Sequence, residues 1–403
     1  MGRVLDAEMI ELRRGYRLRD TRYVCSECVE DSFLKKTLDE AASATSCSFC
    51  GRSSDSPCAA PFDELMRLIA KPLLQRFNDV DRAGTPSADG GYISSTLSTD
   101  EVLDEIEFHS TQQVRDAVVG AFTIEVWVEA PDGRWGELPY GQELSSAWQQ
   151  FCFVVKHQTR FHFHTRVSTE STGEIAAGEM LDEIADIVTR TRLVQEVPAG
   201  TVLFRGRILN PASAWEPNAQ ELGAPPREKA RANRMNPAGI AYMYLAFDQK
   251  TMLSELGALK DSEIIIGAKF VATRPLRVVD FTDLPSRPSL FDPERRHLDQ
   301  HVAFLQDFVS RISQPVRPGT EDIHYVPTQV VSEYLAQAFQ VDGADALLDG
   351  VIYPSAKMEG GRNLVVFPAR ESFGPQFPTV QFLEHIEWET LVPIAPKAAA
   401  KLS

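Results

Sequence analysis

The sequence predicts an α+β protein made of more than one domain. Three observations predict it: two close cysteine pairs near the N-terminus, helical apolar periodicity through the first half, and short β-rich runs alternating with helices from residue 201 onward. At 403 residues the chain is also longer than one ordinary hydrophobic core supports. We expect a zinc-knuckle unit and a helical domain first, followed by a mixed α/β domain.

The composition is that of a soluble globular protein with a strong negative charge. Apolar residues make up 43%, charged residues 24%, and the formal net charge is -16, which argues against nucleic acid as a general partner. A local cationic pocket stays open, because distant carboxylates are screened over roughly 10 Å. No signal-peptide pattern and no run of about 20 apolar residues is present, so we expect a cytoplasmic protein without membrane contact.

Four cysteines have the spacing of a metal site. Cys25 and Cys28 form one Cys-x2-Cys pair, and Cys47 and Cys50 form a second pair after eighteen intervening residues. Two such knuckles complete a closed tetrahedral site, which leaves no position for a substrate. The spacing therefore predicts structural Zn2+ rather than a catalytic or redox centre. Cys58 and Cys152 stand outside this pattern, and we expect buried or half-buried thiols there.

Four stretches of the first half are expected to be helical, at residues 61–80, 99–122, 143–156 and 176–195. Between the last two lies a cluster of three histidines and two arginines, at His157, Arg160, His162, His164 and Arg166. A metal or ribonuclease site is one interpretation of this cluster. The other is a strand over 160–166 with the histidines on one face, which we favour because no cysteine or carboxylate nearby completes a metal site.

The second half alternates strands with helices. Strands are predicted at 201–208, 240–247, 262–272, 276–281 and 363–367, and helices at about 295–313 and 327–340. The composition shifts at the turn Pro198-Ala199-Gly200, which we take as a domain entrance. The expected domains are a four-cysteine unit, a helical domain, the mixed α/β domain and a short tail, at residues 1–60, 61–195, 196–395 and 396–403.

One strand-helix unit concentrates residues suited to chemistry. Arg234 precedes a turn, Tyr244 lies in the following strand, Asp248 is placed to cap the next helix, and Glu255 lies within that helix. Beside the apolar positions of the helix, Glu255 is either a functional carboxylate or a member of an ordinary salt bridge. Periodicity alone leaves both open.

Arginines gather on either side of this unit. The segment PPREKARANR supplies four cations within eight positions, and Arg205 follows an apolar run and precedes a glycine. Guanidinium groups at strand ends and turns match phosphate oxygens bidentately, as a pyrophosphate clamp requires. No GxGxxG or GxxxxGK[ST] motif follows a strand, so a nucleotide would bind without a Rossmann or P-loop turn.

Taken together, the segments LFRGR, RMNPAGIAYMYLAFDQKTMLSE and DGVIYPSAKMEGGRNLVVF resemble the RES domain family, named for arginine, glutamate and serine. The resemblance covers about residues 198–370. The upstream region, with its cysteine pairs and VKHQTRFHF, resembles the HEPN-type N-terminal domain that accompanies RES domains. Arg160 and His164 are separated by three residues, where HEPN ribonucleases use four to six, which argues against ribonuclease activity.

The resemblance implies an NAD+-consuming enzyme with a core similar to ADP-ribosyltransferases, often the toxin of a bacterial toxin–antitoxin pair. It implies Glu255 as the catalytic carboxylate, Arg205 and Arg234 as the pyrophosphate clamp, Tyr244 against nicotinamide or ribose, and Ser355 on the cofactor or the attacking group. Arg231 is the alternative to Arg234 as second clamp arginine.

The acceptor of the cleaved group stays open on the sequence. Water gives a glycohydrolase and inorganic phosphate gives a phosphorylase. Transfer to a protein or RNA, or an inactive RES-like binding module, are the other functions considered. We expect the NAD+-consuming activity to be restrained. An antitoxin or another regulatory protein, residues 1–195 of the chain itself, or assembly into a homo-oligomer could do this.

Overall fold

The computed structural model divides the chain into two compact units. The first comprises residues 1–146, 169–174 and 287–300, and the second comprises 147–168, 175–286 and 301–403. The structure describes residues 14–18, 21–83, 86–87, 91–92, 95–129, 142–162, 175–210, 218–257, 259, 263–314, 316–317, 319–340, 347–369, 377 and 379–386. Among the helices in these ranges, none has the length and apolar content of a membrane span.

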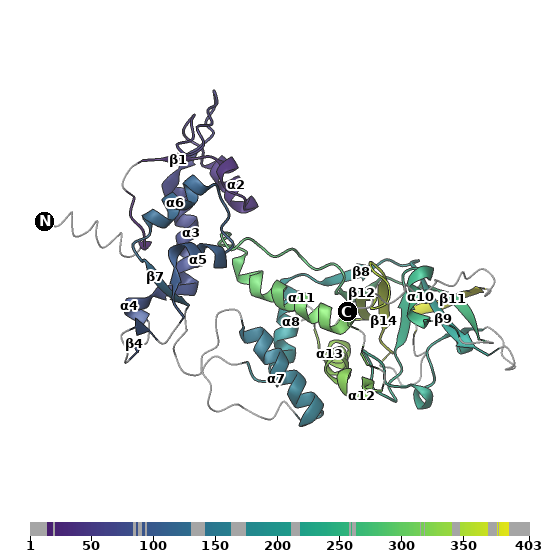
Figure 1. Ribbon diagram of the computed structural model, residues 1–403. Coiled ribbons are helices and arrows are strands. Elements are labelled where there is room, and N and C mark those ends of the chain that lie inside the picture. The colour runs from purple at the N-terminus through teal and green to yellow at the C-terminus, as the bar shows by residue number, and fades with distance from the viewer. Residues whose placement is uncertain are drawn as a thin grey trace. The chain divides into compact units, whose positions relative to one another are not determined.

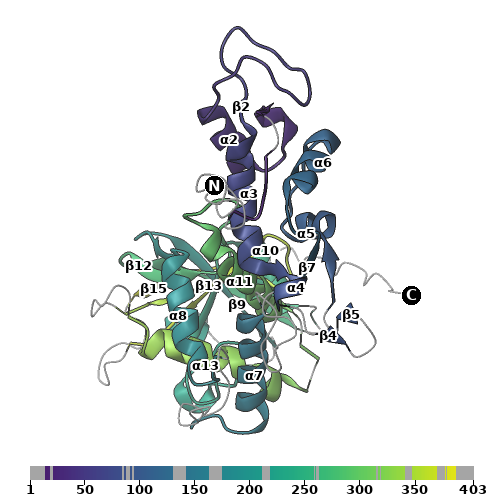
Figure 2. The ribbon, with the colours of Figure 1, turned by 90° about the vertical axis from the view of Figure 1, so that its left-hand side faces the viewer.

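The first unit combines short strands with helices (Figures 1 and 2). Its elements in chain order are β1 (Tyr23–Val24), α2 (Ser32–Glu40), β2 (Ala60–Pro61), α3 (Phe62–Arg76), β3 (Phe77–Asp79), α4 (Val80–Ala83), β4 (Pro86–Ser87), β5 (Gly91–Tyr92), β6 (Leu97–Ser98), α5 (Thr99–Glu105), α6 (Gln112–Ala121) and β7 (Val126–Glu129). The predicted helix over 61–80 is confirmed as α3 up to Arg76. From Phe77 the chain pairs with β7 as a strand instead.

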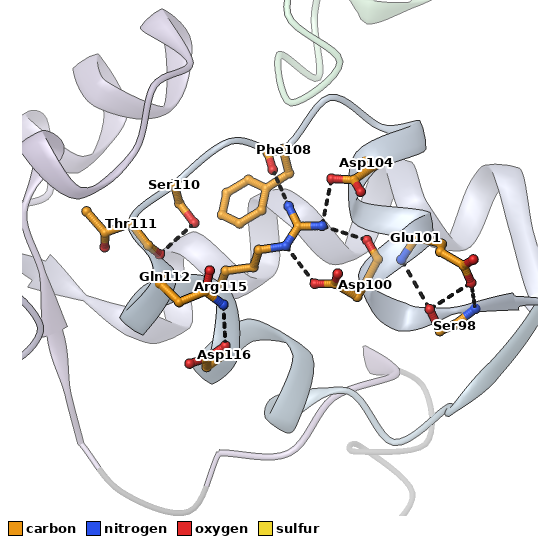
Figure 3. A network of polar contacts seen from close by, with 10 residues as sticks. All are labelled: Ser98, Asp100, Glu101, Asp104, Phe108, Ser110, Thr111, Gln112, Arg115 and Asp116. Carbon is orange, nitrogen blue, oxygen red and sulfur yellow. Dashed lines mark hydrogen bonds and ion pairs between the residues drawn. The ribbon is translucent and has the colours of Figure 1, made fainter.

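The stretch 99–122, which we expected to be helical, forms two helices with a break between Glu105 and Gln112. Ser98 begins α5 with a capping box to Glu101, and the helix ends before Glu107, which has a positive φ. Arg115 of α6 then joins the two helices (Figure 3): its guanidinium donates to the carboxylates of Asp100 and Asp104, at 2.6 Å each. Arg115 thus connects α5 and α6 by ion pairs.

The second unit is built on a mixed eight-stranded sheet. From one edge to the other its strands are β15 (Val380–Ile386), β11 (Ile264–Ala272), β9 (Val202–Leu209), β10 (Met243–Ala246), β14 (Arg362–Val366), β13 (Gly350–Pro354), β12 (Leu276–Asp280) and β8 (Val194–Val197). All neighbouring strands are antiparallel except β12 and β13, which are parallel. Buried side chains such as Leu203, Leu245 and Leu364 form its core.

The helices of the second unit are α7 (Glu143–His157, the greater part), α8 (Met180–Arg190), α9 (Ala219–Leu222), α10 (Gln249–Leu256), α11 (Asp299–Ser313, again the greater part), α12 (Glu321–His324) and α13 (Val326–Gln337). The helices predicted at 143–156, 176–195, 295–313 and 327–340 are confirmed, with one correction. Residues 194 and 195 belong to strand β8, because they pair with β12. Strands β13 and β15 were not among the predicted strands.

Candidate functional site

Glu255 lies in α10, which follows strand β10 and begins after Asp248, the predicted capping residue. Asp248 accepts the Thr251 N–H at 2.8 Å and the Thr251 hydroxyl at 2.7 Å, which starts α10 directly after β10. The helix ends at Leu256, followed by Gly257 with a φ of +79°. Glu255 thus stands in the last turn of a short helix.

Two donors from distant parts of the chain converge on one oxygen of Glu255. The Ser355 hydroxyl donates to Oε1 at 2.6 Å, and the Asn363 side-chain amide donates to the same oxygen at 2.8 Å. Ser355 follows β13, and Asn363 lies in β14, paired with Tyr353 of β13 and with Ala246 of β10. Within the described residues, Oε2 has no hydrogen-bond partner and the carboxylate has no ion pair. One oxygen is fixed, and the other keeps its acceptor capacity.

Ser355 is itself held in one orientation. Its hydroxyl oxygen accepts the backbone N–H groups of Lys357 at 3.2 Å and Met358 at 3.1 Å. With two donors on the oxygen, its single proton points to Glu255. The structure therefore makes Ser355 the residue that orients the carboxylate.

Arg205 lies inside the sheet rather than on an edge strand. Its strand β9 runs between β11 and β10, and its Nη1 donates to the Tyr244 carbonyl at 2.7 Å. Burial, followed by the like charge of Arg207, lowers the pKa of Arg205 to about 10. Its Nε is buried without a hydrogen-bond partner among the described residues. A half-buried cation with unused donors is suited to an anionic ligand.

Gly206 explains how α10 reaches β9. A Cβ added at this position would lie 2.6 Å from Cδ1 of Leu256 and 3.2 Å from the sulfur of Met252. The missing side chain of Gly206 therefore leaves room for the helix that carries Glu255.

We expect Gly206→Ala to destabilise the protein by about 1–2 kcal/mol, since overpacking forces α10 away from β9. Urea unfolding measures this loss, and the double variant with Leu256→Ala should recover part of it. Gly120→Ala is the control, because a Cβ there meets no atom within 4 Å. Equal stability of Gly206→Ala and the wild type would contradict the packing argument.

Tyr244 and Arg234 belong to one hydrogen-bonded turn. The Tyr244 hydroxyl donates to Oδ1 of Asn236 at 2.6 Å and accepts the Met235 N–H at 3.2 Å. The Arg234 guanidinium donates to the Ile312 and Gln314 carbonyls, the latter at 2.9 Å. It also lies over the Tyr325 ring, 5.2 Å from the centroid.

Arg231, the alternative clamp residue, is exposed, and the contacts described for it involve its backbone carbonyl only. The Arg234 guanidinium, by contrast, is held by two carbonyl groups and the Tyr325 ring.

Tyr353 links the glutamate with the second arginine. Burial raises the pKa of Tyr353, the negative charge of Glu255 raises it further, and the positive charge of Arg234 opposes the rise. Tyr244 in turn senses both Tyr353 and Arg205, although burial is the main reason that its pKa is raised. No hydrogen bond between described residues joins either arginine to Glu255. The interactions that relate them are the electrostatic effects of Glu255 and Arg234 on Tyr353 and of Arg205 on Tyr244.

Asn363 and Tyr353 are the residues that sequence reasoning missed. Both lie in the segment DGVIYPSAKMEGGRNLVVF, which carried part of the family resemblance. Tyr353 precedes the serine by two positions, and Asn363 is a polar residue inside an apolar strand, only 4% exposed. A buried amide in a strand predicts a specific partner, and that signal could have found it.

The four predicted zinc ligands gather in the first unit. Their sulfur atoms lie within 4.8 Å of one another, with separations of 3.7 Å for Cys25–Cys28, 3.5 Å for Cys25–Cys50 and 3.8 Å for Cys28–Cys47. Zn–S bonds of about 2.3 Å in a tetrahedron place sulfurs about 3.8 Å apart, so the cluster fits a metal of this size. Burial raises the pKa of Cys25 to about 11, whereas at Cys47 burial is outweighed by backbone N–H groups of Cys50, Phe49 and Cys25, which lower its pKa to about 7.

The other two cysteines are half-buried, as expected. Cys58 donates to the Thr45 carbonyl at 3.3 Å, and burial raises the pKa of Cys152 to about 11.

The histidine cluster does not form the predicted strand in its described part. Helix α7 extends to His157, and residues 158–162 are turn and irregular chain, with Phe161 85% exposed. His164 and Arg166 lie outside the described residues.

Comparisons with known proteins match the two halves of the chain separately. A family model described as HEPN/RES N-terminal domain 1 matches residues 40–169, and the RES domain model matches residues 207–388. The second range contains Arg234, Tyr244, Glu255 and Ser355, whereas Arg205 lies just before it. The first range contains Cys47 and Cys50 but not the first cysteine pair.

Among solved structures, the M. tuberculosis MbcT-MbcA toxin-antitoxin complex is similar at 15% identity, over 51% of this chain and 92% of that chain. Its TM-score of 0.28 is too low to support an argument. The search of curated proteins gave no significant match.

Proposed function

Because the chain contains a RES domain preceded by a HEPN/RES N-terminal domain 1, we propose that it is a toxin-type enzyme that consumes NAD+ by cleaving the nicotinamide–ribose bond. The observation that carries the proposal is the carboxylate of Glu255, with one oxygen fixed by Ser355 and Asn363 and the other left to accept from a ligand.

One carboxylate suffices for this chemistry. Nicotinamide leaves a cationic nitrogen as a neutral molecule and needs no general acid, while the ribose becomes oxocarbenium-like, as in glycoside hydrolysis. In our proposal, Oε2 of Glu255 accepts from the ribose hydroxyls and stabilises the developing positive charge. Because Ser355 and Asn363 hold the group before the reaction, little reorganisation is needed in the transition state.

The two arginines are proposed to hold the pyrophosphate. A guanidinium has five N–H donors. Arg234 uses two of them on carbonyl groups, and Arg205 uses one, so both retain donors for phosphate oxygens. The Tyr244 hydroxyl is engaged in the turn, so its contribution to a bound dinucleotide would come from the ring face.

The test is to incubate the purified protein with NAD+ and to measure nicotinamide and the second product. ADP-ribose identifies hydrolysis, and its 1″-phosphate, formed only with inorganic phosphate, identifies phosphorolysis. Labelled NAD+ that leaves its label on a protein or RNA identifies transfer instead. If the folded protein releases no nicotinamide under any of these conditions, the proposed NAD+ cleavage is excluded and the inactive binding module is the remaining function.

For the first unit we propose Zn2+ as a structural metal on Cys25, Cys28, Cys47 and Cys50. Four thiolates close the coordination sphere and leave no position for a substrate. We also propose that residues 1–195 or a separate antitoxin-type protein restrain the activity, since unregulated NAD+ loss is harmful to a cell.

We expect Asn363→Ala to reduce the kcat for nicotinamide release by about tenfold with a small change in KM. The reason is that a hydrogen bond to a charged group contributes about 1.5–3 kcal/mol, and Glu255 loses one of the two that orient it. Asn363→Asp should be more damaging, because it sets a second negative charge against Glu255. Steady-state kinetics check both, with Asn78→Ala as an exposed control in the first unit. Wild-type kcat in both Asn363 variants would exclude a positioning role.

A further inference from the structure

A cavity lies in the second unit, and its lining does not include Glu255, Ser355 or Asn363. Its volume is about 630 Å³, and it is walled by parts of α7, α11, α12 and α13 together with the chain between α11 and α12. These helices are labelled in Figure 1. The volume is that of a small-molecule pocket.

The charge of the lining is positive. Lys156, Arg311, Arg317 and His324 all line the cavity, and no aspartate or glutamate does so among its described lining residues. Apolar walls come from Trp148, Ile312, Val316 and Pro327. The whole chain has a formal net charge of -16, so the positive charge of this lining has the opposite sign to the charge of the protein as a whole.

Lys156 and Arg311 come from different helices and line the cavity together with Cys152, while Arg311, Arg317 and His324 are exposed residues. Lys156 of α7 and Arg311 of α11 both lower the pKa of the Cys152 thiol, against the larger effect of burial, which raises it. The Cys152 side chain lines the cavity between them. Arg311 is also paired with Asp307 at 2.6 Å, but its side chain stays 49% exposed. For Arg317 no ion pair is found with any described residue.

We propose that this cavity binds a phosphorylated small molecule. Two guanidinium groups match phosphate oxygens bidentately, an ammonium group adds a point charge, and the apolar wall receives the uncharged part of the ligand. The ligand is a free phosphorylated compound rather than the NAD+ of the proposed active site, because Arg205 and Arg234 are proposed to hold the two phosphate groups that NAD+ has.

The position of the cavity connects it with Arg234. The carbonyls that hold the Arg234 guanidinium belong to Ile312 and Gln314, and both residues line the cavity. Thr328, a third lining residue, donates to the Arg234 carbonyl at 2.6 Å. A ligand in the cavity would therefore contact the residues that fix this arginine.

The test is isothermal titration of inorganic pyrophosphate into the wild type and four variants, without NAD+ and without turnover. Arg317→Gln and the double variant with Arg311→Gln should weaken binding by at least about tenfold for each lost charge-assisted contact. Arg190→Gln is the matched control: like Arg311, it pairs with the aspartate four positions earlier at 2.6 Å, and it is 51% exposed. Its affinity should equal that of the wild type.

Arg205→Gln separates this cavity from the proposed NAD+ site. Unchanged pyrophosphate binding in this variant supports a separate site. The proposal is overturned if the wild type does not bind pyrophosphate, if the Arg311/Arg317 double variant binds it as tightly, or if Arg205→Gln abolishes binding. Because no catalytic step is measured, these outcomes do not depend on whether NAD+ is cleaved.

Discussion

Replacing Glu255 by glutamine is expected to lower the kcat for nicotinamide release by about a thousandfold. The amide oxygen can still accept from Ser355 and Asn363, so the local geometry is kept, while the negative charge that would face the oxocarbenium-like ribose is lost. The loss of one preorganised electrostatic contact of this kind costs about 3–4 kcal/mol in the transition state. Single-turnover assays that follow nicotinamide measure this effect directly.

The control for this prediction is Glu228→Gln, which makes the same chemical change at an exposed glutamate of the second unit. Its activity should remain that of the wild type, and thermal unfolding should be unchanged in both variants. If Glu255→Gln kept more than half of the wild-type rate, the carboxylate would not be the group that stabilises the transition state.

Removal of the proposed zinc is expected to unfold the first unit while the sheet of the second unit persists. Cys25, Cys28 and Cys47 are buried in the same core cluster as Phe62 and Trp127, so loss of the metal removes the link that holds two chain segments in that core. Zinc sites of this type supply about 10–16 kcal/mol of apparent binding free energy in small peptides, which is comparable with the stability of a whole domain.

A chelator titration or Cys47→Ser tests this prediction. Mass spectrometry should find about one zinc per wild-type chain, and limited proteolysis of the metal-free protein should cut within residues 21–129 before residues 194–366. Cys58→Ser is the control, because Cys58 lies outside the four-sulfur cluster. Full metal content or full protease resistance in Cys47→Ser would show that the cluster does not support this unit.

The features that the sequence predicted best depend on local rules. The Cys-x2-Cys spacing predicted a four-sulfur cluster, which the structure contains, and Asp248 predicted the start of α10. The α+β class and the two-part resemblance are likewise confirmed, since several motifs in a fixed order are specific where one motif is not.

The features that escaped prediction depend on partners distant in sequence. Residues 194–197 continue an apolar pattern after α8, and only pairing with β12 makes them a strand. The helical stretch over 99–122 is broken near Glu107, which has a positive φ, and the contacts of Arg115 with Asp100 and Asp104 then join the two helices. Asn363 lies 108 positions from Glu255, and no local pattern connects the two.

The anchoring of Arg234 has a consequence for sequence variation. Its acceptors are main-chain carbonyls at the end of α11, separated from it by 78 and 80 positions. Position 314 is exposed, so a substitution there still presents the same carbonyl oxygen to the guanidinium, whereas Ile312 is 2% exposed and its carbonyl stays in place only while that side chain packs. Arg234 loses these two hydrogen bonds when the end of α11 frays or moves. Its position therefore depends on the backbone at the end of this helix.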